Sequence, residues 1–197
     1  MTTQENTQQT APGKRFQSGV RATAGHGLRH AVRRWWALRG VGSAGDGIVV
    51  DTNVKFLRHT ANLRIGDRAL FKEGARLCVA QPDAHIYIGR NTTIGYHTFL
   101  FASAGIEVGD NCLIAPFCYV VDANHGFARG TNINTQDMTA SPIHIGNDVW
   151  LGVQCIVLAG VRIGSGAVVG AGSLVNADVP ENAIMAGTPA RIQGYRE

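Results

Sequence analysis

The chain has 197 residues, with 18 Lys and Arg against 14 Asp and Glu, which gives a formal net charge of +4. The first 40 residues carry seven basic residues and one acidic residue, whereas the rest of the chain carries 11 basic and 13 acidic residues. The positive charge therefore belongs to an N-terminal arm, and the composition of the remaining chain argues against a nucleic-acid-binding body.

Residues 1–25 are polar and contain Pro12 and several glycines, a composition typical of a disordered segment. The first ten residues are rich in Gln and Thr and do not resemble a signal peptide. No apolar stretch approaches the ~20 residues that a membrane-spanning helix requires. We therefore expect a cytoplasmic protein, with the inner face of the membrane as an alternative position.

A short amphipathic helix is predicted near residues 27–39, at the end of an N-terminal arm that covers residues 1–45. Two interpretations of this helix remain open. It can cap the open end of the domain that follows and shield an unpaired sheet edge, or it can lie on an anionic membrane surface near a lipid-linked substrate. The helical spacing involves Leu28, Val32, Trp35 and Trp36, with Arg29, Arg33, Arg34 and Arg39 on the remaining surface.

The last quarter of the chain repeats with a period of six residues, each marked by a bulky aliphatic side chain. Such a hexapeptide repeat is typical of a parallel β-helix, in which three hexads form one triangular coil and neighbouring coils are about 4.8 Å apart. Gly, Asn and Asp between the aliphatic residues suit the tight corners. The aliphatic positions are Ile145, Leu151, Val157, Ile163, Val169 and Val175, so that Ile145, Leu151 and Val157 should lie under Ile163, Val169 and Val175.

The same period appears earlier in the chain with interruptions, which predicts one β-helix domain over residues 46–197 with seven or eight coils. The largest interruption separates Val120 from Ile145 and predicts a protruding loop near residues 126–142. Insertions of this kind in stacked-repeat proteins are often where binding occurs. Three of the four cysteines stand where the repeat needs a small inward residue, so neither disulfides nor a zinc cluster is expected; these are Cys112, Cys118 and Cys155.

His125 precedes the predicted loop and occupies a hexad position that faces outward. A solvent-reachable imidazole beside a loop suits a general base. Asp122 is a candidate for fixing the imidazole tautomer, and a main-chain carbonyl is the alternative. Trp150 occupies the equivalent outward position one turn later, where a large exposed ring implies cover by a partner subunit or a ligand.

Four segments in this order resemble the hexapeptide-repeat acyltransferases, within them the maltose, galactoside and nodulation-factor O-acetyltransferase branch that includes exopolysaccharide-modifying enzymes. The resemblance implies an all-β left-handed parallel β-helix, assembled as a homotrimer with active sites between subunits. The segments are Asn-His-Gly at 124–126, Pro-Ile-His-Ile-Gly-Asn-Asp-Val-Trp-Leu-Gly at 142–152, Val-Val-Gly-Ala-Gly-Ser at 168–173 and Ala-Gly-Thr-Pro-Ala-Arg at 186–191.

The resemblance also implies roles for individual residues on the donor side. His125 matches the catalytic histidine, Trp150 the tryptophan beside the acyl donor, and the backbone N–H of Val153 the oxyanion donor. The remaining positions match the path of the pantetheine arm, at Gly152 and Ala171, and a basic residue near the coenzyme A phosphates, at Arg191.

The chain departs from the family pattern at other positions. Asn176, followed by Ala177, stands where the family often has Lys or Thr before an Asp, so one phosphate contact is expected to be missing. The acceptor-side Asn and Asp of the galactoside enzymes align near Gly95 and Ser103. We therefore expect Asn124 and Ser103 to line the acceptor site, but not to grip the acceptor as a galactoside is gripped.

The expected activity is transfer of acetyl from acetyl-CoA to a sugar hydroxyl of a surface polysaccharide or its precursor, with no metal. N-acetylation of an amino sugar or an antibiotic is the first alternative. The γ-class carbonic anhydrases share the fold, but two of their three metal-binding histidines have four other residues between them. No two histidines of this sequence have that spacing. A β-helix scaffold without catalysis is a third alternative, which failure to bind coenzyme A would favour.

Overall fold

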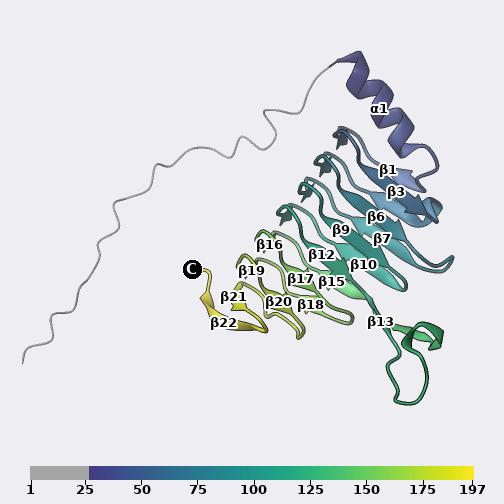
Figure 1. Cartoon of the computed structure of the whole chain (residues 1–197). Helices are drawn as coiled ribbons and strands as arrows, with labels where there is room; N and C mark the ends of the chain where they lie inside the picture. The colour runs from purple at the N-terminus through teal and green to yellow at the C-terminus, as the bar shows by residue number, and fades with distance from the viewer. Residues whose placement is uncertain (1–26) are drawn as a thin grey trace, which may run out of the picture.

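The computed structural model describes residues 27–197, so residues 1–25, for which disorder was predicted, lie outside the described residues. A stack of short parallel strands forms a three-sided prism (Figure 1). Each coil contributes one strand to each side, so strands distant in sequence pair directly. Two six-stranded sheets and one eight-stranded sheet result, which we call the first, second and third faces in the order in which the chain enters them.

The strands are as follows. The first face holds β1 (Ser43–Ala44), β4 (Leu63–Ile65), β7 (His85–Ile88), β10 (Gly105–Val108), β15 (Ile143–Ile145) and β18 (Arg162–Ile163). The second face holds β2 (Val49–Val50), β5 (Leu70–Phe71), β8 (Thr93–Ile94), β11 (Leu113–Ile114), β16 (Trp150–Leu151), β19 (Val168–Val169), β21 (Ala183–Gly187) and β22 (Ala190–Tyr195). The third face holds β3 (Lys55–Arg58), β6 (Arg76–Val79), β9 (Phe99–Ala102), β12 (Tyr119–Val121), β17 (Ile156–Val157) and β20 (Leu174–Val175).

The register of the last coils is the predicted one. Ile145 pairs with Ile163, Leu151 with Val169, and Val157 with Val175, all in parallel. The hexapeptide period therefore places each aliphatic residue directly beside its counterpart in the next coil. The predicted fold class, an all-β parallel β-helix with a short N-terminal helix, is confirmed.

The number of coils was overestimated. Six coils carry a strand on every face within the described chain, where seven or eight were expected. The reason is the length of the early coils, because paired positions on the first face are 21, 23 and 20 residues apart before the hairpin and 18 apart after it. Strands of four residues on the third face, such as Lys55–Arg58, take up part of this extra length.

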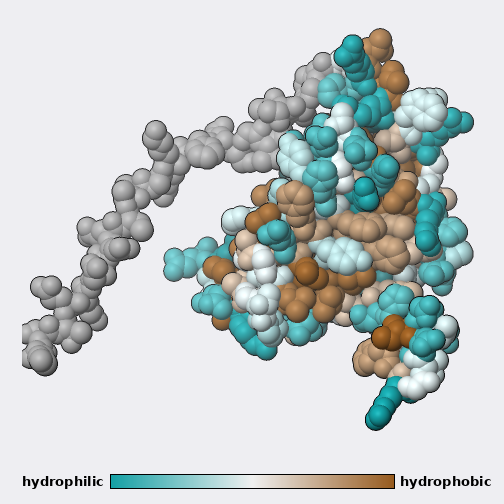
Figure 2. Space-filling model, viewed as in Figure 1, coloured by the Kyte–Doolittle hydropathy of each residue, from teal (hydrophilic) through white to brown (hydrophobic). Residues whose placement is uncertain are grey.

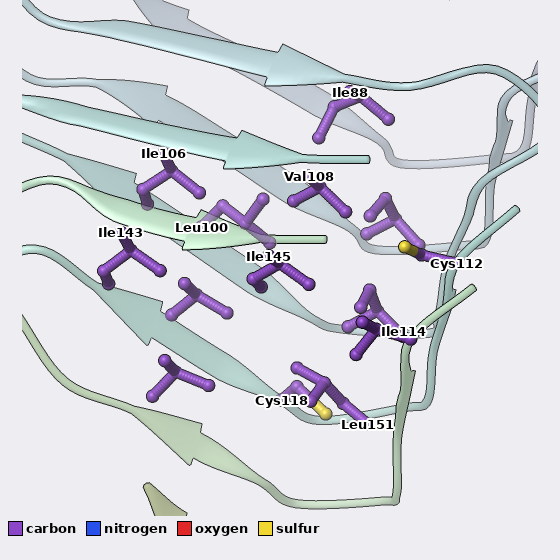
Figure 3. Close-up of a cluster of buried hydrophobic side chains, with 14 of the residues drawn as sticks. Ile88, Leu100, Ile106, Val108, Cys112, Ile114, Cys118, Ile143, Ile145 and Leu151 are labelled. Carbon is purple, nitrogen blue, oxygen red and sulfur yellow. The ribbon is translucent and has the colours of Figure 1, made fainter. Parts of the chain in front are cut away.

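A single hydrophobic core fills the prism. The inward residues of all three faces are buried and contact their counterparts in the coils above and below (Figure 3). The cysteines behave as predicted, since Cys112, Cys118 and Cys155 are buried beside this core. Each is a small inward residue near a corner, where the cross-section of the prism is narrowest.

The chain leaves the prism once, between the fourth coil (β10 to β12) and the fifth coil (β15 to β17). There β13 (Ala123–His125) pairs in antiparallel fashion with β14 (Met138–Ala140), and a 3₁₀ turn at Ile133–Thr135 lies between them. This hairpin projects from the edge where the third face ends and the first face begins (Figure 1).

Helix α1 (Leu28–Leu38) lies against β2 and β3 of the first coil. It forms the upper end of the stack in Figure 1. Among the described residues, no helix is both long enough and apolar enough to span a bilayer.

Candidate active site

The predicted base lies on the projecting hairpin. His125 is the last residue of β13, pairs with Met138 across the hairpin and is exposed. Its imidazole makes no hydrogen bond and no ring contact within the described chain. The side chain is therefore free to meet a group that comes from outside the chain.

Asp122 does not hold the imidazole, which corrects the sequence-based expectation. Its carboxylate is fully buried (0% exposed) and accepts three backbone N–H bonds: Ser103 N to Oδ1 at 2.6 Å, Ala104 N to Oδ2 at 2.8 Å and Gly105 N to Oδ2 at 2.7 Å. The physical reason is its position at the end of the third face, from which it points into the prism and satisfies a turn that has no strand partner. Asp122 therefore positions the turn at 103–105.

Of the two predicted acceptor residues, one lies in the turn at 103–105 and the other lies on the hairpin that follows Asp122. Ser103 is half-buried in the turn that Asp122 holds, and its backbone N–H is one of the three donors. Asn124 is exposed on β13, next to His125. Both belong to the edge between the third and first faces, so the structure brings them close to the hairpin that carries the base.

Trp150 lies in the outer row of the second face with 50% of its surface exposed. It pairs with Leu113 in the coil before and Val168 in the coil after, so an apolar strip surrounds the ring. Large exposed rings among apolar neighbours are typical of surfaces that a ligand or a partner covers. Figure 2 shows that hydrophobic surface extends across the middle of the body.

Unpaired backbone donors follow the edge between the second and third faces. Within the described chain, the N–H groups of Tyr96, Val153 and Ala171 make no hydrogen bond. On the edge between the first and second faces, four of the six equivalent N–H groups donate to a side chain of the next coil, whereas those of Asp67 and Ser165 do not; the four are Asp46, Arg90, Asp110 and Asn147. The N–H of Val153, the predicted oxyanion donor, is therefore available to a ligand.

Gly152 is required by the stacking of the coils. It is buried, its N–H donates to Val169 O at 2.8 Å, and a Cβ atom there would lie 2.6 Å from the backbone N of Ala171. Stacking of the coils therefore demands glycine at this position. The exposed residues at this corner are the neighbours Val153 and Ala171.

The two residues predicted to lie near phosphates are exposed but separated from each other. Asn176 follows the last strand of the third face. Arg191 lies on β22, where its Nη1 donates to its own neighbour's carbonyl, Ala190 O, at 2.8 Å. Because β22 pairs with β21 beside the second face, Arg191 lies beyond Trp150 towards the C-terminal end of the stack.

The sequence analysis missed two aromatic rings on the same edge as Val153. Phe117 has φ of 61° and His97 has φ of 53°, in the left-handed region that bulky residues rarely adopt. Their rings stack at 5.4 Å, and Phe117 is 55% exposed. The available signal was the corner position itself, which Gly74 and Gly172 fill in other coils.

No cysteine is placed to act as an acyl carrier. All four thiols are buried. A hydrogen bond to Cys155 and burial raise the pKa of Cys118, and burial raises the pKa of Cys112. The same hydrogen bond with Cys118 lowers the pKa of Cys155, but this thiol is buried like the others. Their burial favours direct transfer to the acceptor over a thioester intermediate on the protein.

Base and donor positions lie on opposite sides of one chain. The hairpin with His125 leaves the edge between the third and first faces, and the second face with Trp150 is the side opposite that edge in a three-sided prism. Figure 1 shows the hairpin far from β16 and β19. One chain therefore presents the imidazole of His125 and the N–H of Val153 on two different edges of the prism.

Two family models of hexapeptide repeats match segments of this chain. A family model described as "Bacterial transferase hexapeptide (six repeats)" matches residues 142–177, and one described as "Hexapeptide repeat of succinyl-transferase" matches residues 85–116. The putative lipopolysaccharide biosynthesis O-acetyl transferase WbbJ of Escherichia coli (strain K12) is 31% identical over 145 residues, which cover 70% of this chain and 74% of WbbJ. The chain belongs to the hexapeptide-repeat transferase family.

Other members of the hexapeptide-repeat transferase family are similar over part of their length. The galactoside O-acetyltransferase of E. coli (strain K12) is 37% identical over 109 residues, and the probable acetyltransferase Rv3034c of Mycobacterium tuberculosis (strain ATCC 25618 / H37Rv) is 33% identical over 140 residues. These matches cover 55% and 71% of this chain, but only 53% and 39% of those relatives.

Solved structures of the hexapeptide-repeat transferase family share the fold. An acetyltransferase from Vibrio cholerae O1 biovar eltor, complexed with acetyl-CoA, superposes with a TM-score of 0.63 at 26% identity and covers 87% of this chain and 80% of that one. The N-acyltransferase AntD from Bacillus cereus reaches a TM-score of 0.73 at 20% identity and covers 87% and 90%. The second likeness concerns the fold alone.

Proposed function

We propose that this protein transfers acetyl from acetyl-CoA to a hydroxyl of a sugar in a surface polysaccharide or its precursor. The single observation that carries the proposal is the free N–H of Val153 on the same coil as the half-exposed Trp150. This pairing of an amide donor with an apolar platform suits a thioester with an extended arm. The acetyl-CoA complex of the V. cholerae relative supports this choice of donor.

The proposed reaction is a direct transfer. The imidazole of His125 removes the proton of the acceptor hydroxyl while that oxygen attacks the thioester carbonyl. The carbonyl oxygen becomes an oxyanion, which the N–H of Val153 stabilises. The tetrahedral intermediate collapses, the C–S bond breaks, and the imidazolium returns the proton to the leaving thiolate of coenzyme A.

The acceptor is assigned from two observations. The relative that this chain covers best among those above, WbbJ, is named as a putative lipopolysaccharide O-acetyl transferase. Ser103 and Asn124 supply hydroxyl and amide groups beside the hairpin, and both can hydrogen-bond to sugar hydroxyls. A sugar hydroxyl is therefore favoured over an amino group, and the use of acetyl-CoA favours a cytoplasmic reaction.

The functional unit that we propose is a homotrimer in which neighbouring copies share each site. The second and third faces expose large apolar residues, whereas the first face presents polar side chains in register. Packing the apolar faces against neighbours would cover this surface and bring one hairpin to the donor edge of the next copy. The apolar residues are Leu113, Phe117, Tyr119, Trp150, Val153 and Ile156, and the polar row is Arg64, Tyr87, Glu107, His144 and Arg162.

The activity is tested by measuring coenzyme A release from acetyl-CoA with a panel of acceptors. We expect turnover with oligosaccharides that carry only hydroxyl groups, and an O-acetyl product by mass spectrometry. Faster turnover with amino sugars and an N-acetyl product would contradict hydroxyl transfer. Failure to bind coenzyme A in calorimetry would instead favour a scaffold.

Sharing of the site is tested by subunit complementation. Co-expression of His125→Ala and Trp150→Ala chains should yield assemblies with about a quarter of the wild-type turnover at low acetyl-CoA, because random neighbours restore one interface in four. Each variant expressed alone should be slower than the mixture. A mixture that only averages the two separate variants, or an active monomer by light scattering, would contradict the shared site.

A further inference from the structure

Helix α1 turns its apolar side away from the protein that it caps. Leu28, Val32 and Trp35 follow one stripe of the helix with Trp36 beside them, and their exposed fractions are 82%, 49%, 62% and 62%. No residue of the helix is buried. A helix that capped the prism through its hydrophobic stripe would show the opposite arrangement.

The opposite side of the helix makes the contact with the first coil. Arg33 donates from Nε to Val50 O at 2.9 Å, and Ala37 and Leu38 pack on the edge of the core. Arg33, Ala37 and Leu38 thus hold the helix against the first coil, and the hydrogen bond from Arg33 satisfies the backbone carbonyl of Val50 at the end of the stack. The helix therefore covers the end of the first coil with the side that carries Arg33. Its apolar stripe has no partner in the described chain.

The charge around the stripe identifies the partner. Residues 28–39 carry four arginines and no acidic residue. Arg39 holds its guanidinium 5.8 Å from the ring centres of both Trp35 and Trp36, so cationic and aromatic groups lie together at one end of the stripe. Tryptophan and arginine on an amphipathic helix match the headgroup region of an anionic bilayer, where indole rings enter the interface and guanidinium groups meet phosphates.

We infer that α1 is a docking surface for an anionic phospholipid membrane, with Leu28, Val32, Trp35 and Trp36 inserted into the interface. The bilayer then lies beyond the N-terminal end of the stack, and the transferase body stays in the aqueous phase. This inference does not depend on the acetyl-transfer reaction, since binding to lipid can be measured without turnover.

The test is co-sedimentation of the full chain with vesicles. We expect binding to vesicles of equal parts phosphatidylcholine and phosphatidylglycerol, weakened by salt, and little binding to pure phosphatidylcholine. Trp35→Ser with Trp36→Ser should weaken binding at least ~10-fold, because two large apolar side chains leave the interface. Arg29→Gln and Arg34→Gln should each weaken it about fivefold.

The matched controls are Tyr195→Ser, an exposed aromatic at the far end of the stack, and Arg162→Gln on the first face, and neither should change binding. In a Trp150→Phe chain, only Trp35 and Trp36 of the three tryptophans remain, and their emission should shift to the blue on anionic vesicles. Wild-type binding that survives the tryptophan change, equal binding to neutral vesicles, or loss of self-association instead of lipid binding in the tryptophan variant would overturn the inference.

Discussion

His125→Ala should lower kcat at least ~10²-fold, the loss expected when a general base is removed. The KM for acetyl-CoA should change little, since the donor positions lie on a different face from the hairpin. Steady-state kinetics with the best hydroxyl acceptor provide the measurement. Added imidazole should restore part of the rate, because a small base can enter the space that the side chain leaves.

His59→Ala is the matched control, since His59 is also exposed but lies in the loop after the first coil. We expect wild-type rates for this variant. A His125→Ala enzyme that retains its kcat would remove the imidazole from the mechanism. The fold and the donor site would not be affected by that result, because the imidazole of His125 makes no hydrogen bond within the described chain.

Asp122→Ala should lower the free energy of unfolding by at least ~3 kcal/mol. Three backbone donors lose a buried charged acceptor at once, and hydrogen bonds to charged groups contribute about 1.5–3 kcal/mol each. Urea denaturation followed by circular dichroism measures the change. Asp122→Asn keeps one carbonyl acceptor and should lie between the wild type and the alanine variant.

A second readout separates this role from catalysis. As a positioning residue for the turn at 103–105, Asp122 should affect the KM for the acceptor more than kcat in the Asn variant. If Asp122→Asn unfolds like the wild type and yet loses kcat as severely as His125→Ala, the carboxylate orients the imidazole after all. We expect the larger effect on the KM for the acceptor, because both carboxylate oxygens of Asp122 already accept backbone hydrogen bonds.

The repeat period predicted the core, since aliphatic residues six apart have no alternative in a three-sided coil. Ile145 beside Ile163 and the burial of Cys155 both follow from counting. The early coils could not be counted in this way, because their corners and four-residue strands vary in length. The overestimate of coils came from applying the regular period of the C-terminal part to the whole chain.

The positions of candidate site residues could be predicted from the sequence only for side chains that follow the hexapeptide register. Trp150 stands outward as the hexad position requires. The role of Asp122 could not be read from its nearness to His125, because the chain leaves the prism between them and the two side chains enter different surroundings. Likewise, the free N–H of Val153 depends on which corners are bonded by neighbouring coils, which the sequence does not state.

Pro116 occupies the same corner position in the fourth coil that Val153 and Ala171 occupy in the fifth and sixth, and proline has no amide hydrogen. A molecule lying along this edge therefore meets amide donors one coil apart, about 4.8 Å, and meets none in the fourth coil. Every residue except proline would preserve the donors at 153 and 171. Homologues can thus diverge freely in side chain at these two positions while still recognising the same carbonyl groups, and sequence identity there is a poor guide to shared ligand chemistry.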